Sequence, residues 1–479
     1  MLAFILKNKN DIIYLLLLLF SIFIGPVYRN IKTADSKKWI GTALGLLLII
    51  TVSGYDAAHP ILSGALGMFA VKNSHIKSCH VVAFFFMFSY LFVFRIGEKF
   101  GMKSHSGHTN LVEMIIVLRV VGVAFEMNGS WLAANQRDKG KKDGKDVENK
   151  DGKDEEFPEL INPNLEDLLH YCFNYIGLLT GPYYRYRTFN DYFYRPYSKY
   201  ADHMGFTTKN LRIVPLYVTL YLALAKFFPL EYVFSDEYAN RTFFYRIMYP
   251  WMLFATFRTR LYSGMTLAEC VCTASGLGAY PVDGRNRSGH GPTVGYMKLK
   301  NMSDKEARVT KYDFNTIECM DVWGCETVVT LRDSMKVWNK AVQYWVAMVV
   351  YKRFPIVPLK IHAALFVSVI WHGFHAGYFF CIYFCPFYLM AEDIFYKLYY
   401  KDATGMVRIS FLSCFCDTIV SSITSCLFHL HKDYFLLAYK CIAAILLVWF
   451  GLVWFVATVT KIIGQVRAGL AHEGFRIPL

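Results

Sequence analysis

The chain has 479 residues, of which 55% are hydrophobic and 17% are aromatic, whereas 18% are charged. About a quarter of the residues in a soluble domain are charged, so this composition excludes an ordinary soluble protein. The formal net charge is +14, but the basic residues lie in short loops between apolar runs. That pattern favours anionic lipid headgroups and argues against nucleic acid as the partner.

Apolar runs recur along the whole chain, and a helix needs roughly 20 apolar residues to cross a bilayer. The stronger runs lie at residues 12–27, 39–53, 79–94, 111–125, 213–228, 361–390 and 436–459. Weaker runs lie at residues 168–180, 243–257, 344–350 and 411–428. We therefore predict an all-α, polytopic integral membrane protein with about ten to twelve membrane helices, some of them short or re-entrant.

Two polar stretches interrupt the apolar pattern. The first, residues 136–156, reads QRDKGKKDGKDVENKDGKDEE and contains no aromatic residue. Such a segment cannot bury enough apolar surface to fold, so we predict a disordered loop within one membrane domain that spans residues 1–479. The second stretch, residues 281–321, has few apolar residues, and we predict that it lies outside the membrane.

Residues 330–351 show apolar side chains at three- and four-residue steps, which predicts a helix that begins at an interface and runs inward. Asn339 falls on this helix, a few turns past its start. Its amide can donate and accept hydrogen bonds, so it can orient a hydroxyl nucleophile or hold a thioester oxygen as charge develops. An amide that only packs helices together is the alternative.

The sequence WHGFHAG at residues 371–377 lies inside the apolar run 361–390. An ionisable group at bilayer depth is costly and is by default a functional hypothesis. His372 is suited to such a role because the pKa of an imidazole is close to neutrality, so the ring can take or give a proton. A core histidine bonded to a nearby carbonyl is the alternative reading.

A metal site is the second hypothesis for this segment. His375 follows three residues after His372 and would share a helical face with it. Histidine-rich membrane oxidases need several such clusters, whereas the only other close pair in the C-terminal half is His429 and His431. We therefore predict no metal site.

Familiar soluble catalytic patterns are missing from the sequence. It contains no G-x-S-x-G motif of the α/β-hydrolases. None of the histidines is followed by Asp five positions later, which removes the H-x-x-x-x-D acyltransferase motif. P-loop and Rossmann glycine patterns do not occur either.

The pairing of Asn339 with His372 resembles the membrane-bound O-acyltransferase family, which has an intramembrane His and an upstream Asn or Asp. Four longer segments look like the lysophosphatidylinositol acyltransferase branch of that family: HTNLVEMIIVLRVVGVAFE (108–126), FNYIGLLTGPYYRYRTF (173–189), AECVCTASGLGAYP (268–281) and WNKAVQYWVA (338–347). The resemblance runs from His108 to about Met390, and the charged segment 136–156 is an insertion without a counterpart.

The resemblance implies transfer of an acyl group, preferably polyunsaturated such as arachidonoyl, from acyl-CoA to the sn-2 hydroxyl of lysophosphatidylinositol. It also implies the endoplasmic reticulum membrane, and acyl-CoA as a co-substrate without any cofactor. His372 would be the general base and Asn339 would orient the hydroxyl or stabilise the oxyanion. The predicted substrate-binding residues are Arg185, Tyr183, Tyr184 and Trp338; arginine pairs well with phosphate, and tyrosine favours the membrane interface.

Three alternatives stay open from the sequence. The acceptor can carry another headgroup, and the segment with Arg185 can be an ordinary interfacial anchor. A lipid transporter would use the charged residues in or beside apolar runs, namely Asp56, Glu113, Arg119 and Glu269, to line a polar path. Protein partners cannot be predicted.

Overall fold

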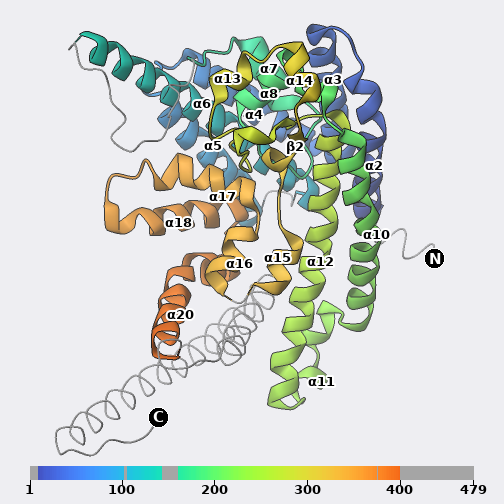
Figure 1. The fold of residues 1–479 in the computed structure, drawn as a ribbon. Helices are drawn as coiled ribbons and strands as arrows, with labels where there is room; N and C mark the ends of the chain where they lie inside the picture. The colour runs from blue at the N-terminus through green and yellow to red at the C-terminus, as the bar shows by residue number, and fades with distance from the viewer. Residues whose placement is uncertain (1–8, 102–104, 143–159, 329, 375, 400–479) are drawn as a thin grey trace, which may run out of the picture.

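The computed structural model describes residues 9–101, 105–142, 160–328, 330–374 and 376–399. Within these ranges the chain is mostly helical and has one two-stranded sheet (Figure 1). The helical fold predicted from the apolar runs is therefore confirmed.

The N-terminal third forms a helix bundle with α6 at its centre. Its helices are α2 (Lys9–Arg29), α3 (Ala34–Ser53), α4 (Ala58–Asn73), α5 (Cys79–Ile96) and α6 (Gly107–Lys142), with the short turns η1 (Gly54–Ala57) and η2 (Gly97–Phe100). Helix α6 packs against α3, α4 and α5. Between Val112 and Ala124 its side chains are buried on every face, including those of Glu113 and Arg119.

Three short helices follow and pack across the bundle: α7 (Leu165–Phe173), α8 (Tyr186–Tyr194) and α9 (Tyr197–Tyr200). Helix α7 begins at Asn164, whose side chain accepts a hydrogen bond from the backbone N–H of Asp167 at 2.7 Å. The weak apolar run 168–180 is therefore not one helix, because α7 ends at Phe173 and an irregular buried segment leads to α8.

Two long helices, α10 (His203–Phe227) and α12 (Phe243–Ser275), pack along each other, and α12 also packs on α2. Figure 1 shows α10 and α12 side by side on the right of the molecule. They are joined through η3 (Leu230–Phe234) and α11 (Asp236–Ala239). Helix α12 ends at Gly276, whose φ of +82° supplies the left-handed residue that closes many helices.

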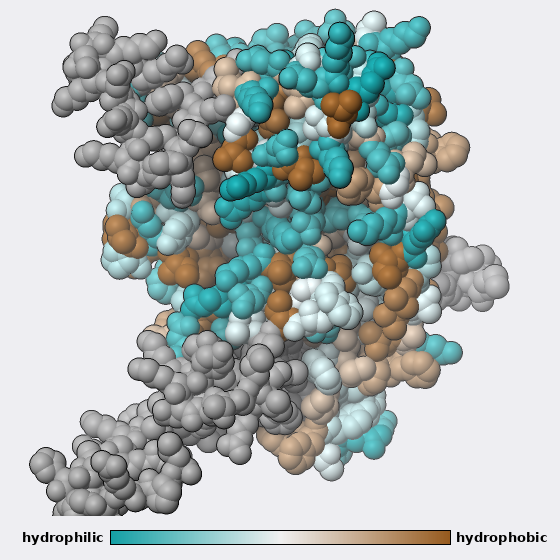
Figure 2. Space-filling model, in the orientation of Figure 1, coloured by the Kyte–Doolittle hydropathy of each residue, from teal (hydrophilic) through white to brown (hydrophobic). Residues whose placement is uncertain are grey.

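Residues 280–321, which we call the polar cap, contain the sheet and several short turns. The elements are β1 (Tyr280–Pro281), η4 (Val282–Gly284), α13 (Tyr296–Lys300), α14 (Asp304–Val309), β2 (Tyr312–Asp313) and η5 (Asn315–Ile317). The strands are antiparallel, with Tyr280 opposite Asp313. In Figure 2 hydrophilic residues gather over the upper part of the molecule, where α13 and α14 lie in Figure 1. This distribution agrees with the predicted position outside the membrane.

The chain then forms a helical hairpin, which we define as residues 339–372. It consists of α17 (Lys340–Val346), the π-helical turn η6 (Ala347–Tyr351), η7 (Val357–Leu359) and α18 (Lys360–His372). It is preceded by α15 (Val322–Thr327) and α16 (Leu331–Val337). It is followed by α19 (Ala376–Tyr378), the π-helical η8 (Phe379–Tyr383) and α20 (Cys385–Tyr399).

Four segments of the described chain are long and apolar enough to cross a membrane: Lys9–Arg29, Ala34–Asn73, Cys79–Ile96 and His203–Phe234. Large apolar side chains remain exposed on them, such as Phe23 at 80% and Phe85 at 65%. Exposure of that kind is costly in water and favourable in lipid. The chain is therefore a multi-pass membrane protein, and the count of about ten to twelve membrane helices stays a prediction.

The single helix predicted over residues 330–351 is wrong. Helix α16 ends at Val337, Asn339 has a φ of +40°, and α17 begins at Lys340. The spacing of apolar residues is kept on both sides of the break, so it does not reveal one left-handed residue. Asparagine is among the few residues that tolerate this conformation.

The apolar run 361–390 is also interrupted. Helix α18 ends at His372, and Gly373 has a φ of +141°, which residues with a side chain rarely adopt. A helical face shared by His372 and His375 is therefore wrong, because the helix does not continue between them. His375 itself lies outside the described residues.

The start of the predicted disordered loop is helical. Helix α6 continues to Lys142 and so includes residues 136–142. Glutamine, arginine and lysine favour helix, and extending an existing helix is far easier than starting one. Residues 143–156 lie outside the described residues, as do the apolar runs 411–428 and 436–459 and the pair His429 and His431.

Candidate active site

The hairpin brings Asn339 and His372 to the same end of one structural unit. Helix α17 and η6 lead into a turn, and α18 returns and packs against both of them. Asn339 is the N-cap of α17, and His372 is the last residue of α18. Figure 1 shows α17 and α18 lying side by side. Because the two arms run in opposite directions, Asn339 and His372 both lie at the end of the hairpin away from its turn, and we call this end the hairpin end.

The side chain of Asn339 is not used as a helix cap. It makes no capping hydrogen bond, although its backbone carbonyl accepts one from the N–H of Gln343 at 3.1 Å. The left-handed backbone conformation costs free energy for a residue other than glycine, and it persists only where the surrounding structure stabilises it. Among the described residues the side-chain amide of Asn339 makes no hydrogen bond, so its donor and acceptor can serve a ligand.

The polar cap and α12 hold this left-handed residue in place. The N–H of Lys340 donates to the carbonyl of Cys319 at 2.7 Å, and Lys340 Nζ lies 2.8 Å from Glu318 Oε1. The buried carboxylate of Glu269, on α12, accepts the N–H of Cys319 at 2.5 Å. Trp338 packs its ring against Tyr262 of the same helix, with 6.4 Å between ring centres. The segment that carries Asn339 is thus fixed from two sides.

His372 is held by its neighbours in the sequence. The indole N–H of Trp371 donates to the carbonyl of Met114 on α6 at 3.1 Å. Arg95 Nη1, on α5, donates to the carbonyl of Ile370 at 3.2 Å. These bonds pin the last turn of α18 to two helices of the bundle.

The imidazole of His372 stacks on the ring of Tyr378, with 5.6 Å between centres and an interplanar angle of 24°. Among the residues that the structure describes, none makes a hydrogen bond to either ring nitrogen of His372. The described residues therefore do not support the alternative that His372 is a core histidine hydrogen-bonded to a carbonyl. A ring that is clamped by stacking but free at both nitrogens can exchange a proton with a ligand.

A second histidine lies near the hairpin and differs from His372. His290, in the polar cap, packs edge-on against Tyr344 of α17, with 5.3 Å between ring centres. Burial, and then the charge of Arg185, lower the pKa of His290 to about 3. Nδ1 of His290 lies 3.3 Å from the carbonyl oxygen of Gly291 in hydrogen-bond geometry, so this ring nitrogen already has a partner, whereas the described residues form no hydrogen bond to the ring of His372.

The family-like segment 173–189 is built around the fully buried guanidinium of Arg119, on α6. Its Nη1 donates to three backbone carbonyls at 3.1 Å, and its Nη2 donates to a fourth at 2.6 Å and to the hydroxyl of Tyr184 at 3.0 Å. The four carbonyls belong to Tyr171, Cys172, Asn174 and Ile176. We call this group the Arg119 core; it satisfies an irregular buried backbone that would otherwise be unpaired.

The predicted substrate-binding residues of this segment lie inside the protein. Tyr184 is buried, and its hydroxyl also donates to the carbonyl of Ile176 at 2.7 Å. Tyr183 is buried with its ring directly against Gly122, where a Cβ would lie 2.5 Å from the Tyr183 hydroxyl. The interfacial position expected for these two tyrosines is therefore wrong, because α6 and the Arg119 core enclose them.

Arg185 already has a partner of opposite charge. Its Nε lies 3.3 Å from Glu126 Oε2, and both side chains are largely buried. Glu126 also accepts the N–H of Tyr186 at 2.7 Å, so this carboxylate caps the start of α8. The structure thus brings Asn339, Trp338 and His372 to the hairpin region, whereas Arg185 belongs to the scaffold beside it.

The charged residues considered for a transport path do not form one. Arg119 is occupied by the Arg119 core, and Glu269 holds the polar cap. Glu113 accepts a hydrogen bond from Ser63 at 3.0 Å, and Asp56 lies 3.5 Å from His105. Each of the four has a partner on a different element, which argues against a shared polar channel.

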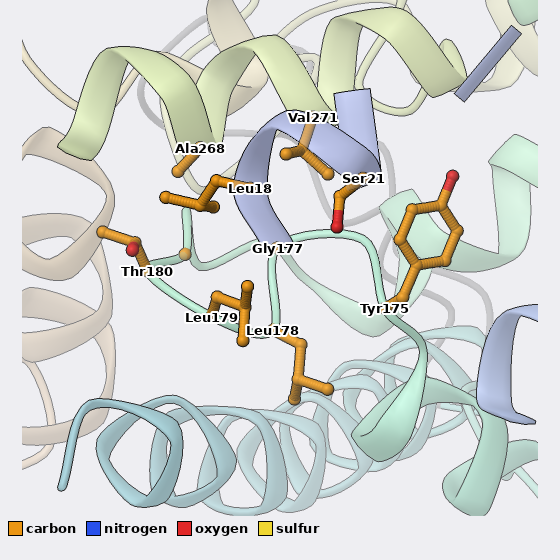
Figure 3. A pocket seen from close by; sticks show the side chains of 10 residues that line it. Leu18, Ser21, Tyr175, Gly177, Leu178, Leu179, Thr180, Ala268 and Val271 are labelled. Atoms are coloured by element: carbon orange, nitrogen blue, oxygen red, sulfur yellow. The ribbon is translucent and has the colours of Figure 1, made fainter. Parts of the chain in front are cut away.

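One hollow lies near the segment 175–181 (Figure 3), and its free volume is about 10 Å³, which is room for about one water molecule. It is lined mainly by apolar side chains, among them Leu18, Leu178, Leu179 and Val271. Ligand sites for molecules of drug size are about 300–1,000 Å³, so an acyl chain with its headgroup does not fit. Neither Asn339 nor His372 lines it. In the described part of the chain, no group of three metal-ligating side chains is present.

Sequence reasoning missed Arg95 and Glu126. Arg95 directly follows the apolar run 79–94, where a basic residue suggests a helix end at the interface. Its position beside Ile370 depends on a contact between residues far apart in the chain. The one signal available was a basic residue in the last turn of an apolar helix, and such a residue ordinarily indicates an anchor at the membrane interface.

A multi-span helical fold with an Asn and a His at one end of an inner hairpin defines a class of membrane enzyme. The family model of MBOAT, the membrane-bound O-acyltransferase family, matches residues 67–431. The chain belongs to this family and is an acyltransferase, which confirms the resemblance inferred from the sequence. It therefore acts on an acyl donor and an acceptor at a membrane.

Three similar proteins, from fly, human and frog, are each named a membrane-bound acylglycerophosphatidylinositol O-acyltransferase. The membrane-bound acylglycerophosphatidylinositol O-acyltransferase frj of Drosophila melanogaster is 43% identical over 404 residues, which cover 83% of this chain and 81% of the relative. The protein of that name from Homo sapiens, MBOAT7, is 32% identical over 386 residues, with 79% and 78% covered. The Xenopus laevis mboat7 protein is 31% identical over 387 residues, with 80% and 79% covered.

Proposed function

We propose that this protein transfers an acyl group from acyl-CoA to the sn-2 hydroxyl of lysophosphatidylinositol. The observation that carries the proposal is the hairpin end, where Asn339 in a left-handed conformation and His372, whose ring makes no hydrogen bond to the described residues, belong to one unit. The acceptor is supported by similar proteins from fly, frog and human, each named an acylglycerophosphatidylinositol O-acyltransferase.

In the proposed reaction His372 takes the proton of the sn-2 hydroxyl as its oxygen attacks the thioester carbonyl. An ester C–O bond forms, the C–S bond breaks, and the proton passes from the imidazole to the departing CoA thiolate. General-base assistance of this kind contributes about 10²–10⁴-fold. The amide N–H of Asn339 stabilises the oxyanion or orients the hydroxyl, which is worth about 10²–10³-fold for a well-placed donor.

The other parts of the proposal concern the surroundings of the reaction. Trp338 lines the site next to Asn339, whereas Arg185, Tyr183 and Tyr184 act on the acceptor through the scaffold they build. The acyl chain is polyunsaturated, such as arachidonoyl, and no cofactor takes part. The enzyme works in the endoplasmic reticulum membrane. A buried site protects the thioester from hydrolysis.

The test uses purified full-length protein in detergent with labelled arachidonoyl-CoA and a panel of lysophospholipids at equal mole fraction. We expect the fastest initial rate with lysophosphatidylinositol, ahead of the choline, ethanolamine and serine analogues. A site that hydrogen-bonds the hydroxyls of a headgroup can reject analogues without them strongly. Equal rates on the inositol and choline acceptors would refute the proposed acceptor and leave the acyltransferase class intact.

A further inference from the structure

Arg95 lies beside the last turn of α18 and close to Ile370 and Gly373, on either side of Trp371 and His372. Its Nη1 donates to the carbonyl of Ile370 at 3.2 Å. The same atom would lie 3.6 Å from a Cβ placed on Gly373. Since these two residues flank Trp371 and His372, the guanidinium lies against the segment that carries the proposed general base.

The charge of Arg95 lacks a close partner within the described part of the protein. A guanidinium has five N–H donors, and the bond to Ile370 is the one hydrogen bond found for it there. Glu113 acts on it electrostatically but forms no ion pair with it, and instead accepts a hydrogen bond from Ser63. Arg119, the other arginine in the bundle interior, donates to five groups.

A partly buried cation with unused donors is costly unless an anion completes it. In the reaction assigned above, the acceptor supplies such an anion next to His372. Its phosphodiester is attached to the glycerol carbon adjacent to the one that bears the sn-2 hydroxyl. The phosphates of acyl-CoA are separated from the thioester by the whole pantetheine arm. They therefore cannot lie beside His372 while the thioester is there.

We propose that Arg95 binds the phosphodiester of the lysophospholipid acceptor and thereby sets its sn-2 hydroxyl against His372. The proposal rests on the function proposed above. Arginine is suited to the task because its planar fork matches two phosphate oxygens at once. The residue is a binding residue for the acceptor and takes no part in the proton transfer. It also replaces Arg185 as the expected reader of phosphate, since Arg185 is paired with Glu126.

The decisive probe is a lysophosphatidylinositol analogue that lacks the sn-2 hydroxyl, which binds without reacting. We expect Arg95→Gln to raise both the KM for lysophosphatidylinositol and the inhibition constant of this analogue by about 10–100-fold, the range for a charged hydrogen bond. The KM for arachidonoyl-CoA should stay the same. Arg95→Lys should recover part of the loss, because it keeps the charge and loses the fork.

Arg353 provides a matched control in the same hairpin. It lies in the turn away from the hairpin end, and its Nη1 donates to Asn128 Oδ1 at 3.0 Å. Arg353→Gln should leave the inhibition constant of the analogue unchanged. Comparing the thermal stability of both variants separates a folding defect from a binding defect.

The proposal is overturned if Arg95→Gln lowers kcat while the inhibition constant of the analogue stays at the wild-type value. That result would assign Arg95 to the oxyanion or to positioning His372. Failure of the underlying function looks different, because the wild-type protein would then transfer no label to lysophosphatidylinositol at all. A lysophosphatidic acid acceptor tests the phosphate alone, and it should lose affinity in Arg95→Gln by a similar factor.

Discussion

The Arg119 core and the hairpin end differ in how many hydrogen bonds their polar groups make within the protein. In the Arg119 core the guanidinium donates to four carbonyls and one hydroxyl, and the carboxylate of Glu126 nearby is also fully engaged. At the hairpin end, the amide of Asn339 makes no cap bond, and Arg95 uses one donor. Polar groups whose hydrogen bonds are made within the protein build structure, whereas partly buried groups with unused donors can bind a ligand.

The comparison predicts its largest effect at the hairpin end, for His372→Ala. We expect acyl transfer to fall by at least about 10²–10⁴-fold, the contribution of a general base. Expression and membrane insertion should be unchanged. The measurement is the initial rate with labelled acyl-CoA and lysophosphatidylinositol.

His362 offers the control, because it lies on the same helix α18 and contacts the rings of Tyr383 and Phe387. His362→Ala should keep most of the activity. Near-normal turnover in His372→Ala would remove that residue from the mechanism.

The next effect is expected for Asn339. Asn339→Ala should lower kcat by about 10²–10³-fold with a small change in KM, because the contact strengthens in the transition state. Asn339→Gly separates the amide from the backbone, since glycine adopts a φ of +40° without strain. Both variants should be equally slow if the amide matters. Recovery of activity in the glycine variant would mean that Asn339 serves only to shape the chain.

Arg185 should show the behaviour of a scaffold residue. Removing one partner of a buried ion pair costs about 3–5 kcal/mol, so Arg185→Ala should lower the stability of the protein in thermal unfolding. The ratio of rates on the inositol and choline acceptors should stay constant in the protein that remains folded. A selective loss of the inositol acceptor at unchanged stability would show that Arg185 reads the headgroup after all.

The smallest effect is expected for deletion of residues 143–156, outside the catalytic elements. This segment is highly charged and has no aromatic residue, and such a composition offers little apolar surface for burial. The deletion leaves α6 complete to Lys142. Turnover and thermal stability should both match wild type, and a clear loss of turnover would indicate that the segment contacts the substrate or a partner.

The sequence predicted the long apolar helices correctly, but it did not predict where the backbone interrupts a helix. Membrane helices at 12–27, 39–53, 79–94 and 213–228 follow from apolar length alone, and the structure has apolar helices there. The break at Asn339 could not be seen, because one residue at positive φ leaves the apolar spacing intact. The ion pair of Arg185 could not be predicted, because its partner Glu126 lies 59 residues away in the chain. This ion pair forms because α6, which carries Glu126, packs against α8, which begins directly after Arg185.

The central claim is that Asn339 and His372 act as one catalytic unit, and a double-mutant cycle tests it most directly. Single-turnover rates, with enzyme in excess over labelled arachidonoyl-CoA, are measured for wild type, Asn339→Ala, His372→Ala and the double variant. Residues that act together in one step lose activity non-additively. We therefore expect the double variant to be as slow as His372→Ala alone. If the two losses multiply, the residues act independently, and the hairpin end is not a single active site.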